Sequence, residues 1–152
     1  MKPQALDAAA PSGPLTHDLI VIGAGPAGMA AAITAAGLGL KTLLLDEQPR
    51  AGGQIYRDVG RVVDRQPSIA RLLGPDYVHG ATQVRALETG AVEHRCGALV
   101  WDVARDLTVT ALREGRAEQW RAPQLIAATG AMERASPIPG WTLPGVMAVS
   151  AL

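Results

Sequence analysis

Residues 18–46 read DLIVIGAGPAGMAAAITAAGLGLKTLLLD, and this stretch predicts how the rest of the chain folds. An apolar run at residues 19–22 ends at the glycines of a G-x-G-x-x-G sequence. A helical pattern follows, and then a second apolar run at residues 42–45, which Asp46 closes. This order of strand, turn, helix and strand is the context in which a glycine fingerprint indicates a dinucleotide-binding site.

Each glycine of the fingerprint has its own physical role. Gly23 permits the tight turn after the strand, Gly25 lets a pyrophosphate approach the backbone, and Gly28 lets the helix pack closely on the sheet. Pro26 and Ala27 lie at the start of the helix, where the missing N–H of a proline costs little. The remaining N–H groups and the helix dipole favour negative charge there, so these five residues form the predicted phosphate site.

The acidic residue after the second apolar run is the expected ribose ligand. Asp46 lies 18 residues after Gly28, close to the roughly 20-residue separation typical of the carboxylate that binds a dinucleotide ribose. Glu47 is the competing ligand, and Asp46 is preferred because it directly follows the apolar run. The alternative is that Asp46 only caps the end of its strand.

Composition and cysteine content restrict the class of protein. The formal net charge is zero, which argues against a nucleic-acid partner recruited by bulk charge. Cys96 is the only cysteine, so an internal disulfide is excluded and a reducing, cytoplasmic setting is the expectation. No apolar run reaches the roughly 18 residues of a membrane helix, and no residue spacing indicates a metal site. Residues 1–17 lack periodicity, which predicts a disordered tail with His17 facing solvent.

A second pair of glycines follows the second apolar run. Residues 50–57 read RAGGQIYR, and Gly52 and Gly53 would let the backbone approach a flat ligand. Taken alone, the segment favours a plain surface turn. Arg50 and Arg57 form a basic pair that either holds phosphate or is simply solvated, and both alternatives stay open at this point.

Two motifs carry a resemblance to a known family. QPRAGGQIYR at residues 48–57 follows the fingerprint, and ATGAMER at residues 128–134 is followed by PIPGWTLPGVM at residues 137–147. Together they resemble FAD-dependent, pyridine nucleotide-disulphide oxidoreductase-like flavoproteins, which have the glutathione-reductase-like fold with two dinucleotide-binding domains. Within that family the chain resembles the larger subunits of heteromeric amine-oxidising dehydrogenases, such as opine oxidases, hydrogen cyanide synthase and D-hydroxyproline dehydrogenase.

The resemblance implies FAD as the cofactor and assigns further residues to it. Three of them would lie along the ribityl chain and the flavin, namely Gly52, Gly53 and Gln54. Val100 would lie near the adenine through its backbone. Thr129 and Gly130 would end a strand beside the cofactor, and the alternative is an ordinary turn from strand to loop. No residue is assigned to catalysis, and NAD(P) would bind only through a domain absent from this chain.

The middle of the chain predicts helices followed by a β-meander. Short helices are expected around residues 68–73 and 79–88. Five short alternating runs follow, at residues 92–96, 98–103, 107–112, 118–121 and 125–128. A simple NAD-binding fold would have helices here, whereas the resembling flavoproteins have a meander, so the pattern favours FAD. The predicted fold class is therefore α/β: a Rossmann-like FAD-binding domain, a parallel sheet with helices plus a β-meander, incomplete at the C-terminus.

The expected function follows from the family. Residues 18–152 would be the N-terminal portion of an FAD/NAD(P)-binding domain from an FAD-dependent oxidoreductase acting on amines or amino-acid derivatives. The second dinucleotide-binding domain and the returning half of the first would be missing. We therefore expect the fragment alone to be inactive and to need a partner subunit or a complementing C-terminal chain. The alternatives are a truncated, non-catalytic remnant and an NAD(P)-binding dehydrogenase domain.

Overall fold

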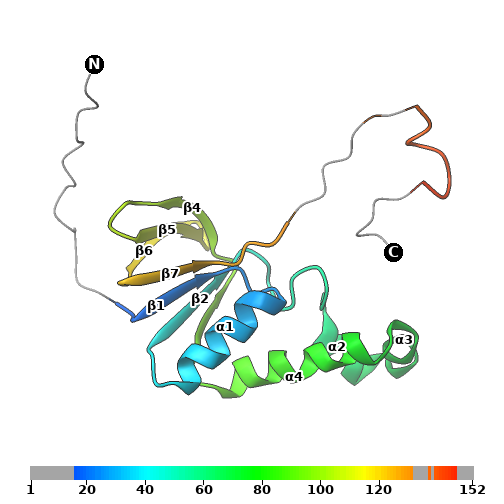
Figure 1. The fold of residues 1–152 in the computed structure, drawn as a ribbon, viewed down its shortest axis with the longest axis horizontal. Helices are drawn as coiled ribbons and strands as arrows, with labels where there is room; N and C mark the ends of the chain where they lie inside the picture. The colour runs from blue at the N-terminus through cyan, green and yellow to red at the C-terminus, as the bar shows by residue number, and fades with distance from the viewer. Residues whose placement is uncertain (1–15, 132–136, 138, 147–152) are drawn as a thin grey trace.

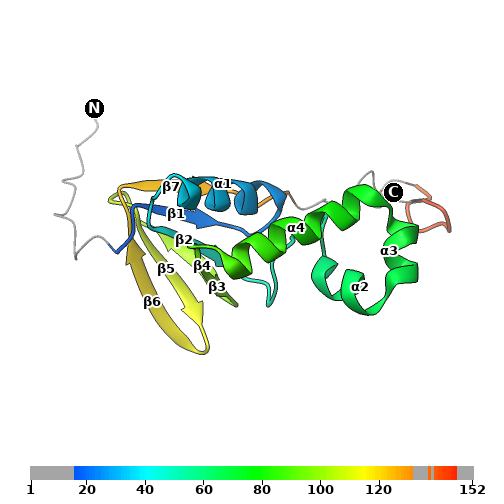
Figure 2. The same cartoon turned by 90° about the horizontal axis from the view of Figure 1, so that it is seen from below.

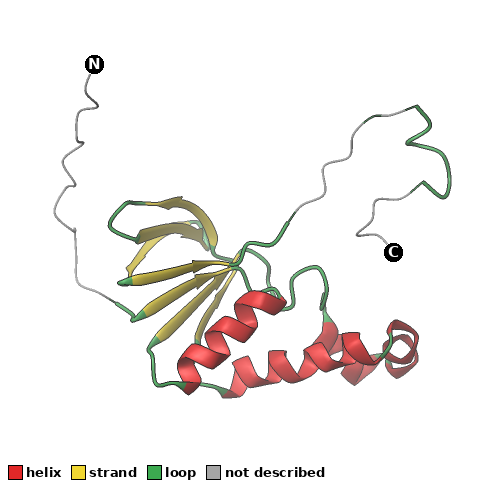
Figure 3. Cartoon of the chain, viewed as in Figure 1, coloured by secondary structure: helices red, strands yellow, loops and turns green. Residues whose placement is uncertain are grey.

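A computed structural model of the chain describes residues 16–131, 137 and 139–146 (Figure 1). Residues 1–15 of the expected tail lie outside the described residues, as do residues 132–136, 138 and 147 of the two C-terminal motifs. The described part is built from helices, a parallel sheet and a smaller antiparallel sheet (Figure 3).

A four-stranded parallel sheet forms the centre of the fold. Its strands are β1 (Leu19–Ile22), β2 (Thr42–Asp46), β3 (Glu93–Cys96) and β7 (Gln124–Ala127), in the order β3-β2-β1-β7. Every residue of β1 and β2 is buried. This is the pattern of inner strands in a parallel sheet that is covered on both faces.

Four helices connect the first three strands of this sheet. They are α1 (Pro26–Gly37) between β1 and β2, and α2 (Val59–Arg65), α3 (Pro67–Leu73) and α4 (Pro75–Thr89) between β2 and β3. The alanine-rich sequence of α1 favours a helix and keeps it slim enough to lie close to the strands. Figure 1 shows α1 and α4 side by side, whereas Figure 2 shows α2 and α3 beyond the edge of the sheet.

The antiparallel sheet is a three-stranded meander. It consists of β4 (Leu99–Val103), β5 (Thr108–Arg113) and β6 (Arg116–Arg121), in the order β4-β5-β6. The β5–β6 hairpin turns at Glu114 and Gly115, whose φ angles of 51° and 76° match the two positive values of a type I′ turn.

The two faces of the parallel sheet bury separate cores, because side chains alternate along each strand. The core on the helix side contains Leu19, Val21, Met29, Ala32, Leu44 and Leu87. The core on the meander side contains Ile20, Ile22, Leu43, Leu45, Val109, Ala111 and Trp120. Complete burial of one such aliphatic side chain stabilises the fold by about 1.5–3 kcal/mol, so these two clusters hold the three layers together.

Three of the five alternating runs form the predicted meander, but the first and the last do not. Residues 93–96 form β3, which pairs in parallel with β2, and residues 124–127 form β7, which pairs in parallel with β1. The middle of the chain therefore contains a crossover through α4 as well as a meander. Alternation indicates that a segment is a strand, but it does not select the partner of that strand.

The helix predictions hold in outline. The helix expected at residues 68–73 is α3, and the one expected at residues 79–88 is α4, which begins earlier, at Pro75. The sequence does not predict α2, because VGRVVDR has no strong helical pattern. Among the described helices, none has the length and apolar character that crossing a membrane requires.

His17 is buried, which corrects the expectation that it faces solvent: only 6% of its surface is exposed. Its Nε2 lies 3.0 Å from a carboxylate oxygen of Glu93, and its Nδ1 lies 2.9 Å from the hydroxyl of Thr16. The Thr16 hydroxyl also bonds to the backbone N–H and C=O of Arg121. Residues 16 and 17 thus fasten β3 and β6 at the amino end of the parallel sheet.

Candidate functional site

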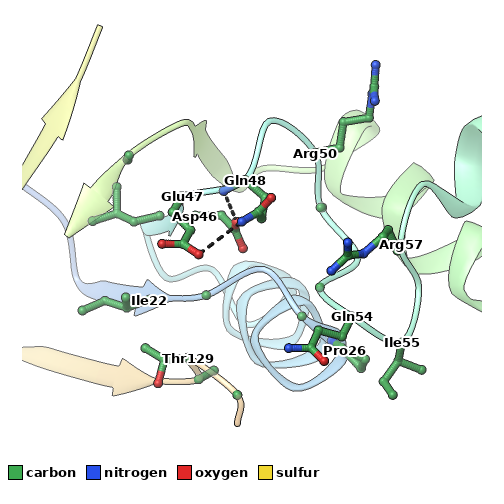
Figure 4. A pocket seen from close by; sticks show the side chains of 18 of the residues that line it. Ile22, Pro26, Asp46, Glu47, Gln48, Arg50, Gln54, Ile55, Arg57 and Thr129 are labelled. Atoms are coloured by element: carbon green, nitrogen blue, oxygen red, sulfur yellow. Dashed lines mark hydrogen bonds between the residues drawn. The ribbon is translucent and has the colours of Figure 1, made fainter. Parts of the chain in front are cut away.

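A pocket of about 710 Å³ opens where the carboxyl ends of β1, β2 and β7 meet (Figure 4). The segments that follow these three strands supply much of its lining, and the start of β4 adds Leu99 and Val100. The volume lies within the range of about 300–1,000 Å³ that is typical of ligand sites. Ligands of open α/β sheets bind at this end of the strands.

The fingerprint glycines divide into two structural positions and one open position. A Cβ on Gly23, which has a φ of +100°, would overlap the carbonyl oxygen of Ala128, and a Cβ on Gly28 would overlap the carbonyl oxygen of Gly23. A Cβ on Gly25 would meet its nearest described neighbour, the Cα of Gly53, at 4.0 Å. Gly23 and Gly28 are therefore required by the fold, whereas Gly25 leaves backbone open at the pocket.

The first turn of α1 has its N–H groups available to a ligand. Gly25 is the N-cap, Pro26 occupies the first turn, and no side chain caps the helix. The first helical bond runs from the N–H of Met29 to the carbonyl of Gly25, at 2.9 Å. The preceding N–H groups, those of Ala27 and Gly28, have no intrahelical acceptor, and the first turn carries no acidic residue that would oppose an anion.

The second glycine loop packs directly on the first. The N–H of Gly52 donates to the carbonyl of Ala24 at 2.8 Å, and a Cβ on Gly53 would lie 2.8 Å from the Cα of Gly25. Gly52 has a φ of +129°, and a Cβ there would overlap the carbonyl oxygen of Tyr56. The paired glycines thus have a structural reason that the sequence did not reveal: they allow two backbone segments to touch.

The two candidate ribose ligands occupy different environments. Asp46 is 6% exposed, and its carboxylate accepts bonds from the backbone N–H groups of Ala24 and, at 2.6 Å, Gln48. Glu47 is exposed at the pocket, where it accepts a bond of 3.1 Å from the side-chain amide of Gln48. Both bonds of Gln48 are drawn in Figure 4. Asp46 therefore braces the first loop from within, whereas Glu47 faces the space that a ligand would fill.

Most of the residues predicted from the sequence line this one pocket. They are Gly23, Gly25, Pro26, Asp46, Glu47, Gly53, Gln54, Val100, Thr129 and Gly130. Ala27, Gly28 and Gly52 are not part of the lining and lie behind it in the packed backbone. The amide of Gln54 donates to the carbonyl of Ala131 at 3.4 Å, which joins the second loop to the segment after β7.

Sequence reasoning does not single out Gln48, Ile55, Leu99 or Ala131, which also line the pocket. The signal for Gln48 is its position, because it directly follows two predicted ligands at the end of a strand. Leu99 and Ala131 carry no such signal, since they reach the pocket only through the packing of the meander and of β7.

The single cysteine is not an activated nucleophile. Its Sγ lies 3.4 Å from Nε2 of His94 on the same strand. Burial is the main cause that raises the pKa of the Cys96 thiol, and burial also lowers the pKa of His94, so both groups favour their neutral forms. Among the described residues, no group of three or more His, Cys, Asp or Glu side chains is placed to hold a metal ion.

The fold and the pocket define a dinucleotide-binding α/β domain, with a glycine turn between a buried strand and a helix N-terminus. Comparison with known families then identifies which one: the chain belongs to the pyridine nucleotide-disulphide oxidoreductase family, which matches residues 17–150.

Two curated relatives are parts of larger enzymes. One belongs to the opine oxidase of Agrobacterium tumefaciens (strain Ach5), of which it is the A subunit; it is 44% identical, with 89% of this chain and 28% of that protein covered. The other is the HcnB subunit of the hydrogen cyanide synthase of Pseudomonas protegens; it is 35% identical, with 88% of this chain and 28% of that protein covered. The chain thus spans less than a third of the length of these relatives.

A solved structure shares the fold. The crystal structure of L-proline dehydrogenase from P. horikoshii has a TM-score of 0.58 and 22% identity, with 79% of this chain and 24% of that chain covered. Together the comparisons confirm the predicted resemblance and the predicted class, an FAD-dependent oxidoreductase domain with a Rossmann-like fold.

Proposed function

We propose that this chain forms the FAD cradle of an oxidoreductase subunit that oxidises an amine or an opine. The observation that carries the proposal is the contact between the two glycine loops, which places the open backbone of Gly25 and the uncapped N-terminus of α1 on one pocket. A diphosphate suits this cradle, because it needs N–H donors and close access to backbone. When bound, the flavin would accept a hydride from the substrate and pass the electrons on.

Within this proposal we assign the adenosine ribose to Glu47 rather than to Asp46. Both carboxylate oxygens of Asp46 already accept backbone N–H bonds, and the group is buried. Glu47 is exposed in the pocket, and its one bond in the described structure, with Gln48, lies on the surface. An exposed carboxylate can exchange water for the two hydroxyls of a ribose, whereas Asp46 would have to give up bonds that hold the first loop.

The same proposal includes a partner that completes the sheet. β7 is an edge strand, and no described strand pairs with its outer side. Ile126 on this strand is 40% exposed. An unpaired edge with apolar side chains is a site for another strand, and the relatives are much longer proteins that are named as subunits. The partner is either a second subunit or a complementing C-terminal chain, in a cytoplasmic setting that the single cysteine supports.

The test is a titration of the purified chain with FAD, NAD⁺ and NADP⁺, followed by calorimetry and by flavin fluorescence. We expect FAD to bind more tightly than either nicotinamide. Glu47→Gln should weaken FAD binding about tenfold, the effect of losing one hydrogen bond to a charged group. Glu88→Gln, which removes the same charge from an exposed position on α4, is the matched control and should leave FAD binding unchanged.

Other outcomes would favour the alternatives. Binding of NAD⁺ without FAD would support a nicotinamide-binding dehydrogenase domain, and binding of none of the three would support a non-catalytic remnant. A chain that is monomeric, cooperatively folded and fully loaded with flavin on its own would contradict the need for a partner.

A further inference from the structure

The basic pair of the second loop separates into two residues with different surroundings. Arg50 donates to the carboxylate of Asp58 at 2.8 Å, and Figure 4 shows its guanidinium pointing away from the pocket. Arg57 forms no ion pair within the described part of the chain, and Figure 4 shows its guanidinium pointing into the space between Gln48 and Pro26. Of the two, Arg57 is the one available to a ligand.

The backbone of Arg57 is held on both sides. The ring of Tyr56 lies on the backbone of α4, so closely that a Cβ on Gly80 would overlap it. The carbonyl of Arg57 accepts a bond of 2.6 Å from the phenol of Tyr77. Burial raises the pKa of Tyr77, with a smaller contribution from the Asp58 carboxylate, so the phenol keeps the proton that it donates.

The residue after Arg57 fixes the direction of the chain. Asp58 has a φ of 54°, in the left-handed region that residues other than glycine seldom adopt. Its ion pair with Arg50 holds this conformation. Arg57 is therefore a cation presented from a fixed backbone, which lowers the conformational entropy lost when it binds an anion.

The charges around the pocket leave one cation without a counterion. The lining contains three acidic residues, Asp46, Glu47 and Asp58, and two basic ones, Arg50 and Arg57. Asp58 is paired with Arg50, Asp46 is bonded to backbone N–H groups, and Glu47 is assigned above to a ribose. A diphosphate that entered this pocket would face a net negative lining if Arg57 were absent.

We propose that Arg57 binds the diphosphate of the dinucleotide from the side opposite the N-terminus of α1, whereas Arg50 is a structural partner of Asp58. This inference rests on the proposed function, because it deepens the assignment of the same pocket. The planar guanidinium suits two phosphate oxygens at once, and such charge-assisted bonds are roughly twice as strong as neutral ones. The helix end and Arg57 would then neutralise the diphosphate from two directions.

The test compares the chain with three variants in calorimetric titrations with FAD and with ADP, at low and at high salt. Arg57→Gln should weaken the binding of both ligands about tenfold, and Arg57→Lys should recover part of that loss. The FAD affinity of Arg57→Gln should also depend less on salt, because one exposed ionic contact is gone. Arg61→Gln is the matched control, since it removes an exposed arginine on α2 outside the pocket.

The outcomes separate this inference from the proposed function. Arg57→Gln that binds FAD and ADP as tightly as the unmodified chain, or that loses no more affinity than Arg61→Gln, overturns the role of Arg57 and leaves the FAD cradle intact. An unmodified chain that binds neither FAD nor ADP overturns the proposed function itself. Urea unfolding of each variant verifies that the fold is retained, which is expected because the side chain of Arg57 is exposed.

Discussion

The two ends of the parallel sheet are held together in opposite ways. At the carboxyl end, backbone contacts backbone: the second loop bonds to Ala24, and Gly53 lies against Gly25. At the amino end, side chains make the contacts, with Thr16, His17 and Glu93 bonded in series. The amino end consumes its polar groups on itself, whereas the carboxyl end leaves N–H groups and open backbone for a ligand. Changes at the carboxyl end should therefore alter binding, and changes at the amino end should alter stability.

The largest effect is expected from Gly25→Ala at the carboxyl end. Gly25 has a φ of −73° and a ψ of −179°, which alanine adopts readily, and the added Cβ makes only an ordinary contact with Gly53. The methyl group would occupy the path of the phosphates, so FAD affinity should fall by more than about tenfold, or 1.4 kcal/mol, in fluorescence titrations. The unfolding free energy should change by less than about 1 kcal/mol.

Gly37→Ala, at the far end of the same helix, is the control for this prediction, because a Cβ there meets nothing within 4 Å. It should leave FAD binding unchanged. Equal FAD affinities for Gly25→Ala and the unmodified chain would remove the fingerprint from the proposed phosphate site.

A smaller effect of the opposite kind is expected from Thr16→Val at the amino end. The variant keeps the shape of the side chain but loses the hydroxyl that bonds to the backbone of Arg121 and to His17. The unfolding free energy measured in urea should fall by about 1–2 kcal/mol, since buried partners lose a hydrogen bond. FAD affinity should stay the same. The exposed Thr82 on α4, changed to valine, gives the matched control; a loss of affinity without a loss of stability in Thr16→Val would contradict the division between the two ends.

The smallest effect is expected from Glu93→Gln, and it depends on pH. The bond from His17 is the main cause that lowers the pKa of Glu93, and a bond from Arg95 lowers it further. A carboxyl group with a lowered pKa in the folded state stabilises the fold above its unfolded pKa, and this contribution is lost as the pH falls through the folded pKa. Glu93→Gln should thus be less stable at neutral pH by about 0.5 kcal/mol, a value kept low because the carboxylate is partly exposed.

Below the ordinary glutamate pKa of about 4.3 the two proteins should become equally stable. Urea unfolding over a series of pH values measures this convergence. A stability difference that persists unchanged into acid would show that the His17–Glu93 contact acts through shape and not through charge.

The first crossover could be predicted because its signals are local. The buried runs of β1 and β2, the glycine turn and the alanine-rich helix all lie within 29 consecutive residues. The sequence places β3 and β7 in the meander because the choice of a strand's partner is settled far along the chain: β7 pairs with a strand that begins 105 residues earlier. The burial of His17 has the same origin, since its partner Glu93 is 76 residues away.

The candidate site shows the same limit at the level of single residues. Positions that directly follow a strand, such as Glu47 and Thr129, could be placed at the pocket from sequence, because the ends of parallel strands share one edge. The role of Asp46 could not, since its carboxylate bonds to Ala24 across 22 residues. Nor could the sequence separate Arg57 from Arg50, because the direction of Arg57 depends on contacts with α4, 20 residues further on.

The register of β1 also sets the order in which this domain can assemble. Leu19 pairs with Thr42, 23 residues away, and with Gln124, 105 residues away. The entropy of closing the longer loop exceeds that of the shorter one by about 1.3 kcal/mol if both are treated as flexible chains. The β1–β2 pair should therefore form early and the β1–β7 pair late, so that Thr129 and Gly130 reach the pocket only in the last stage of folding.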